Sequence, residues 1–100
     1  MFKVRCKLKV LSESMVTRFD ERLVEVKCRE IDNGNNVSVY FDKEAEHIDE
    51  VDNLQEDDVI GVGGTLVVSS SQGKNGKNYV NVNIKNVTDF KVLGQMRYEY

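Results

Sequence analysis

The sequence predicts a small, mainly β domain whose five strands close into a barrel, with one short helix between the third and fourth strands. Three observations predict it: segments in which apolar and polar residues alternate, an Asn-Gly turn between two of them, and glycines inside a fourth. The chain has 100 residues, of which 40% are hydrophobic. A chain this short buries only about 60 to 65% of its unfolded surface, which favours one layer or one closed barrel.

The first strand is predicted from Phe2 to Val10, where the alternation is unbroken. Its core face carries Phe2, Val4, Cys6, Leu8 and Val10. Its outer face carries four cations and no acid: Lys3, Arg5, Lys7 and Lys9. The residues that follow, Leu11 to Asp20, predict a loop or a distorted hairpin.

The second and third strands are predicted from Arg22 to Arg29 and from Val37 to Phe41, joined by a hairpin through Asn33-Gly34. The residues expected to point into the core are Val24, Val26, Cys28, Val37, Val39 and Phe41. The opposite parity places Lys27, Arg29 and Tyr40 on the outer face. A short helix is predicted next, from Lys43 to Asn53, with Asp42 as its N-cap.

The fourth strand is predicted from Val59 to Ser69, and its glycines indicate a bulge or a tight bend of the kind that closes a small barrel. A loop over residues 70–78 leads to a fifth strand, Tyr79 to Val87. Val68, Val80, Val82 and Ile84 are expected to point inward. We expect residues 1–90 to form the domain and residues 91–100, which show no clear period, to form an extension that docks on the barrel or on a neighbouring subunit.

This order of strands and helix is the order of the OB-fold, a five-stranded Greek-key barrel. At the level of residues, Leu54–Leu66 resembles the segment that enters the fourth strand in single-stranded DNA-binding proteins, and Gly76–Val82 is similar to the stretch that opens their fifth strand. The chain has no tryptophan and stops at Tyr100 without the long acidic tail of bacterial members. It therefore resembles the short, tailless OB proteins of phages and mobile elements, which implies single-stranded DNA binding in DNA replication or recombination.

The charge is divided along the chain. Residues 42–58 hold nine acids and one lysine, a net of −8, whereas the other 83 residues hold 13 bases and 8 acids, a net of +5, and −8 + 5 gives the total of −3. Charges beyond about 8 Å are largely screened in physiological salt, so a basic face and an acidic flank can coexist. The acidic total therefore does not exclude a nucleic-acid partner.

Binding a single strand requires cations for the phosphates and flat side chains on which bases stack. In an OB-fold these lie on the outer face of the second and third strands and on two loops. The residues expected there or on the neighbouring first strand are Lys7, Lys9, Arg18, Phe19, Lys27, Arg29, Tyr40, Lys74, Lys77 and Tyr79. The partner expected is single-stranded DNA, bound without sequence preference, and stacking chemistry admits RNA as well.

Each of these residues has a structural alternative. The alternating lysines of the first strand are also typical of a solvated face or of a guard against edge-to-edge aggregation. Tyr40 and Tyr79 are equally compatible with packing at the rim, and Phe19 with a loop residue anchored in the core. The alternative function is an OB-fold protein-interaction module or assembly subunit without nucleic-acid binding, whose contacts are the acidic helix and the aromatic C-terminus.

The sequence predicts no enzymatic site. His47 is the only histidine, so it is interpreted as a solvated residue rather than a metal ligand. Gly73–Lys77 lacks the spacing of a phosphate loop, and the acidic segment lacks the spacing of a calcium loop. We expect no cofactor, no metal and no small-molecule substrate.

Location and assembly are expected from general features of the chain. It has no apolar run near the roughly 20 residues of a membrane span and no secretory signal. Two cysteines are too few for a disulfide framework. We expect a cytoplasmic protein, in the host cytoplasm if it comes from a phage, with no membrane partner. A homo-oligomer, dimer or tetramer, is expected because unpaired strand edges gain protection by pairing.

Overall fold

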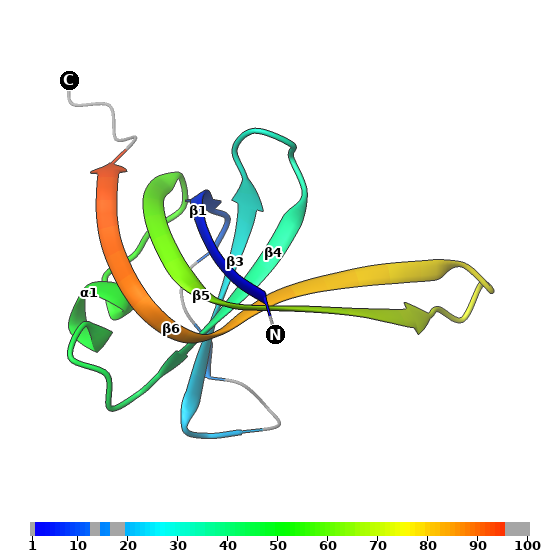
Figure 1. The fold of residues 1–100 in the computed structure, drawn as a ribbon, viewed down its shortest axis with the longest axis horizontal. Helices are drawn as coiled ribbons and strands as arrows, with labels where there is room; N and C mark the ends of the chain where they lie inside the picture. The colour runs from blue at the N-terminus through cyan, green and yellow to red at the C-terminus, as the bar shows by residue number, and fades with distance from the viewer. Residues whose placement is uncertain (1, 13–14, 17–19, 96–100) are drawn as a thin grey trace.

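The computed structural model describes residues 2–12, 15–16 and 20–95 as a small barrel from which one long hairpin projects (Figure 1). Its elements in chain order are β1 (Phe2–Val10), β2 (Met15–Val16), β3 (Leu23–Glu30), β4 (Asn36–Asp42), α1 (Ile48–Asp52), β5 (Asp58–Gln72) and β6 (Asn78–Gln95). The short strand β2, which adds to β3, lies inside the segment predicted as a loop or distorted hairpin.

The strands pair in the order β1-β5-β6-β4-β3, and a further pairing between β1 and β3 closes the barrel. Every pair is antiparallel except β4 with β6, which run parallel where Ser38 and Val39 lie opposite Asn83 and Ile84. One helix lies between β4 and β5. The predicted OB-fold barrel with a short helix is therefore confirmed.

The core is built from the inward parity of the strands. All six residues expected inward on the second and third strands are at most 5% exposed. The remaining buried apolar residues among those described are Leu8, Val10, Val51, Leu54, Ile60, Val62 and Ile84. Alternation therefore identified the core correctly wherever a strand lies within the barrel wall.

Three predicted core residues are exposed: Phe2 is 76%, Val68 58% and Val80 68% accessible. Their parity is the inward one, but Phe2 lies at the free end of β1, and Val68 and Val80 lie on the projecting part of the β5–β6 hairpin. No second layer covers these positions within the described residues. Alternation predicts which face of a strand a side chain lies on, but it does not predict how far along the strand other residues cover that face.

The helix is shorter than predicted. Asp42 does not cap it: the Asp42 side chain accepts the N–H of Glu44 at 2.9 Å and shapes a turn, and α1 begins only at Ile48, after His47. The helix places Val51 in the core, and Leu54 follows it there, both at most 2% exposed. This element therefore closes one end of the barrel.

His47 is packed rather than solvated. Its ring centroid lies 5.7 Å from that of Phe41 and 5.2 Å from that of Phe90, and the two phenyl rings are 5.3 Å apart. Contacts of this geometry stabilise aromatic clusters. The interpretation of His47 as a solvated residue was wrong, because the turn before α1 brings it over the end of the core.

A bend divides the β5–β6 hairpin into a barrel half and a free half. The register shifts between Gly63 and Thr65, and Asn86 on the facing strand has a φ of 51°. Beyond the bend, residues 65–72 and 78–85 continue as a two-stranded ribbon whose base still pairs with β4 at Asn83 and Ile84. Its outer part, residues 68–72 and 78–82 with the turn between them, projects from the barrel and is hereafter called the arm (Figure 1). The arm makes the longest dimension of the molecule 46 Å, against 32 Å and 25 Å for the other two.

The last strand continues past residue 90. Lys91, Val92, Gly94 and Gln95 pair with the first residues of β5, so residues 91–95 belong to the barrel wall. Leu93 covers Gly61: a Cβ on that glycine would lie 3.3 Å from the Leu93 side chain. The sequence shows no clear alternation in this part of β6. The reason is that its partner β5 has a second register shift here, between Val59 and Ile60.

We predict that Gly64→Ala destabilises the protein by about 1 to 3 kcal/mol, the usual cost of overpacking. A Cβ at residue 64 would lie 2.8 Å from the Lys85 carbonyl oxygen and 2.9 Å from Ile84 Cγ2. Urea denaturation measures the effect. Gly94→Ala is the matched control, because a Cβ at residue 94 would meet no atom within 4 Å, and equal losses in the two variants would contradict the close approach.

We predict that the free energy of unfolding decreases as pH rises from about 9 to 12. Burial, with a smaller contribution from Cys6, raises the pKa of the Cys28 thiol from 9.0 to about 12. The folded state therefore retains a proton that the unfolded chain loses, and the stabilisation falls by up to about 1.4 kcal/mol per pH unit. Urea denaturation across this range should show a shallower decrease for Cys28→Ala, and an unchanged slope would contradict the prediction.

Candidate nucleic-acid interface

The outer face of β3 and β4 carries three of the residues predicted from the sequence. The register sets Lys27 opposite Ser38 and Glu25 opposite Tyr40, with all four side chains on the solvent side of the barrel. Lys27 is exposed and Tyr40 is half-buried. Arg29 is also exposed, and its Nε donates to Asn36 Oδ1 at 3.5 Å. Cations and an aromatic ring therefore share one surface, as predicted.

Tyr40 is held between two charged side chains. Its hydroxyl donates to Glu25 Oε2 at 3.3 Å, and Lys85 Nζ lies 5.6 Å from the centroid of its ring. The second contact is a cation–π interaction, worth about 0.5 to 1 kcal/mol at an exposed site. Partial burial and then the Glu25 carboxylate raise the pKa of the Tyr40 phenol. The ring is therefore neutral at physiological pH and fixed in orientation.

A groove of about 530 Å³ opens beside this face, in the fork between β4 and the arm. It exists because β4 and β6 pair only over Ser38–Val39 and Asn83–Ile84 and then diverge. Its polar walls are Lys27, Asn36 and Ser38 on one side and Asn81 and Asn83 on the other. Val80 and Val82 add apolar surface from the arm. The groove therefore offers amide and ammonium donors above an apolar wall.

The two lysines of the predicted loop lie at the tip of the arm. The Gly73 N–H donates to the Lys77 carbonyl oxygen at 2.8 Å, and Gly76 adopts a φ of 78° in this turn. Lys74 and Lys77 are exposed there. Residue 77 is six positions from Asn83, about 20 Å along the ribbon. Tyr79 lies in β6, opposite Ser71.

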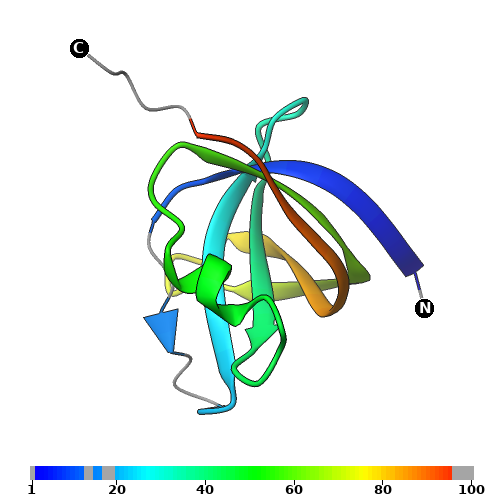
Figure 2. The same ribbon diagram turned by 90° about the vertical axis from the view of Figure 1, so that its left-hand side faces the viewer.

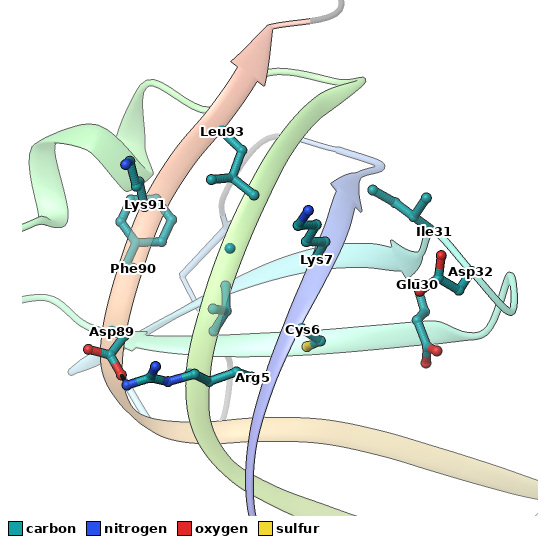
Figure 3. A pocket seen from close by; sticks show the side chains of 13 residues that line it. Arg5, Cys6, Lys7, Glu30, Ile31, Asp32, Asp89, Phe90, Lys91 and Leu93 are labelled. Carbon is teal, nitrogen blue, oxygen red and sulfur yellow. Dashed lines mark hydrogen bonds and ion pairs between the residues drawn. The ribbon is translucent and has the colours of Figure 1, made fainter.

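The two lysines of β1 that were predicted as interface residues, Lys7 and Lys9, have different surroundings. Lys9 is opposite Arg29 in the β1–β3 pairing, and its Nζ is 3.1 Å from Asp57 Oδ1. Lys7 lines a second, larger groove of about 870 Å³ that runs over β1, β5 and the last part of β6 (Figure 3). Lys7 is therefore not part of the groove beside the arm. The remaining predicted residues, Arg18 and Phe19, lie outside the described residues.

Sequence analysis missed Lys85, Glu25 and the asparagines of β6. Parity already placed Lys85, Asn81 and Asn83 on the outer face of their strand. Only the parallel β4–β6 pairing brings that face beside Tyr40. Glu25 was missed because its contact with Tyr40 depends on the register of the β3–β4 hairpin.

The acidic segment lies away from the groove. Residues 42–58 run from the end of β4 through α1 to the start of β5, on the side of the barrel opposite the arm (Figures 1 and 2). One of its acids is structural: Asp58 is 1% exposed and its Oδ2 accepts the Gln55 N–H at 2.9 Å. Apart from Asp57, which pairs with Lys9, the acidic segment is thus separated in space from the groove.

Metal-binding clusters and membrane-spanning helices are both absent from the described part of the chain. Residues 2–12, 15–16 and 20–95 contain no group of three or more His, Cys, Asp or Glu side chains that could hold a metal ion. In the same residues no helix is long and apolar enough to cross a membrane.

Known proteins match this chain in structure. A small single-stranded DNA-binding protein from Streptomyces coelicolor superposes with a TM-score of 0.68 at 12% identity. The alignment covers 91% of this chain and 93% of the Streptomyces protein chain. Rim1, a mitochondrial single-stranded DNA-binding protein from S. cerevisiae, gives a TM-score of 0.61 at 11% identity, covering 92% and 94%. The structure described as "OBody NL8 bound to hen egg-white lysozyme" gives 0.60 at 21% identity, covering 97% and 100%.

These matches establish the fold. No protein-family model matches the sequence, and no curated protein matches it. Two of the three structural neighbours are described as single-stranded DNA-binding proteins, and the third is described in complex with a protein, lysozyme.

Proposed function

We propose that this protein binds single-stranded DNA without sequence preference, across the outer face of β3 and β4 and along the groove beside the arm. The observation that carries the proposal is the outer face around Tyr40, where the aromatic ring lies beneath Lys85 and shares its face with Lys27. A groove lined by amides lies next to this face, on the other side of the short β4–β6 pairing. This is the combination of stacking surface and phosphate-binding groups that single strands require.

The chemistry of this face favours an unpaired strand over a duplex. A base stacks on Tyr40 only if it is not paired within a helix, and the groove donors Lys27 and Asn36 suit phosphate and base oxygens. Glu25 at the edge of the ring repels phosphate and so directs the backbone toward Lys27 and Lys85. Two structural neighbours described as single-stranded DNA-binding proteins support the same function.

The biological setting that we propose is DNA replication or recombination, in which single strands are transiently exposed. The resemblance of the sequence to the tailless OB proteins of phages and mobile elements supports this setting. The acidic segment lies on the opposite side of the barrel, where it repels phosphates and so limits DNA binding to one face.

We predict that replacing Tyr40 by alanine weakens binding by about 1 to 3 kcal/mol, the usual contribution of one base stack. Tyr40→Phe is the matched control, because it keeps the ring and removes only the hydroxyl that donates to Glu25. Fluorescence anisotropy of a labelled oligothymidine measures both. Equal affinities of the alanine and phenylalanine variants would show that the ring does not stack.

We predict that the double variant Lys27→Glu/Lys85→Glu loses two phosphate contacts. The slope of log affinity against log salt should then become shallower by about 1.4, at about 0.7 per contact on a single strand. The control is Lys43→Glu, an exposed lysine at the acidic end of the barrel, which should bind like the unaltered protein.

The anisotropy titration with oligothymidine is repeated with a matched duplex, with no other protein present. Tight binding of the single strand and weak binding of the duplex are expected. If neither is bound at low salt, or if the duplex is bound equally well, the proposed function is wrong.

A further inference from the structure

The strand β1 has a free edge along residues 2–7. On one side β1 pairs with β5 over its length, from Phe2 opposite Leu66 to Lys9 opposite Val59. On the other side it pairs with β3 only from Leu8 to Val10, because β3 ends at Glu30. Among the described residues no strand pairs with this second edge before Leu8. A free edge presents a row of N–H and C=O groups to a further strand.

The register identifies the residues whose backbone groups line this edge. The Leu11 N–H donates to the Lys27 carbonyl oxygen at 2.8 Å, in the same register as the β1–β3 pairs. Because backbone groups alternate between the two sides of a strand, Lys9 also bonds toward β3, and Lys7, Arg5 and Lys3 point their N–H and C=O groups to the free edge. The even-numbered residues bond toward β5.

The side chains along this edge alternate between cationic and apolar. The odd residues Lys3, Arg5 and Lys7 are exposed on the outer face. The even residues Val4 and Cys6 are half-buried on the inner face, and Phe2 beside them is 76% exposed. A strand that paired here would need acids on its outer face and apolar residues on its inner face.

One cation of this edge already has an acidic neighbour. Arg5 Nη2 lies 3.1 Å from Asp89 Oδ2, in an ion pair whose arginine side chain is 82% exposed. The Arg5 side chain crosses β5 to reach Asp89 (Figure 3), so it meets a carboxylate on an added strand by exchanging Asp89 for it.

There is space beside the edge. The larger groove extends across β1 to the turn after β3, where Ile31 is 49% exposed (Figure 3). Glu30 and Asp32 lie at the Lys7 end of the groove and would repel acids there. The acidic residues of an added strand are therefore best placed opposite Lys3 and Arg5.

We propose that the free edge of β1 binds an extended segment of a partner protein in which acidic and apolar residues alternate. The segment adds to the sheet as a strand antiparallel to β1, in line with β3. Its backbone pairs with Lys3, Arg5 and Lys7, its acidic side chains face theirs, and its apolar side chains cover Val4, Cys6 and Phe2. This surface lies outside the interface proposed for DNA.

A second copy of the chain fits this edge less well. Antiparallel pairing of two β1 strands through these groups would set Lys3 opposite Lys7 and Arg5 opposite Arg5. Like charges directly opposite one another destabilise a sheet. Charge complementarity therefore favours an acidic partner over self-association.

The test uses labelled peptides in which valine alternates with glutamate, glutamine or lysine, titrated in the absence of DNA. The glutamate peptide should bind, and the lysine peptide should bind about tenfold or more weakly, since several cross-strand charge pairs are reversed. In ¹⁵N spectra, the glutamate peptide should shift the amides of Lys3, Arg5 and Lys7. Lack of binding, or equal binding of all three peptides, would overturn the proposal, as would self-association of the protein through this edge.

Backbone pairing is tested separately from charge. Arg5→Pro removes an N–H from the free edge while leaving the bonds to β5, and Arg5→Ala is the control that keeps the N–H and loses the same side chain. The proline variant should lose the peptide and the alanine variant should retain most of the affinity.

Modified peptides give the same information without altering the protein. Residues opposite Lys3, Arg5 and Lys7 have side chains on the outer face, so the glutamate amides of the peptide pair with β1. N-methylation of the glutamate residues should abolish binding, whereas N-methylation of the valine residues should not. Equal effects of the two modifications would exclude strand addition.

Discussion

The close approach of β5 to β6 at Gly64 is the constraint on which the rest of the molecule depends. At this position the space that a Cβ would occupy is already taken by the Lys85 carbonyl oxygen and by Ile84. The facing Asn86 adopts a left-handed conformation, and the register of the two strands shifts. One hairpin can therefore serve two purposes, because its first part closes the barrel and its second part leaves it as the arm. The departure of the arm from β4 opens the groove next to Ser38 and Asn83.

The bend also aligns the chemistry of the interface. The parallel contact of β4 with β6 is short: on one side of it Lys85 lies over the ring of Tyr40, and on the other side the strands diverge and open the groove. The hydroxyl of that ring is held by Glu25, so the ring is oriented before any ligand arrives. A surface ordered in advance loses less conformational entropy on binding. The acids of residues 42–58 lie across the barrel, where screening limits their effect on the groove.

The sequence predicted the parts of the structure that depend on local pattern. Alternation identified the residues that face the core on β3 and β4, and it placed Lys27, Arg29 and Tyr40 on one outer face. It failed at Val68 and Val80, because an alternating pattern looks the same whether or not a second layer covers the strand. It also failed at α1, where the side chain of Asp42 shapes a turn and not a helix start. Lys85 and Glu25 depend on pairings between strands, which alternation alone does not specify.

Mapping the backbone amides that shift when a short oligothymidine is added to ¹⁵N-labelled protein tests the central claim most directly. Binding across the outer face of β4 and along the groove predicts shifts at Lys27, Ser38, Tyr40, Asn83 and Lys85, with residues of α1 unchanged. Shifts confined to the outer face of β1 and β5, or to the acidic end of the barrel, would contradict the account and place the nucleic acid on a different surface.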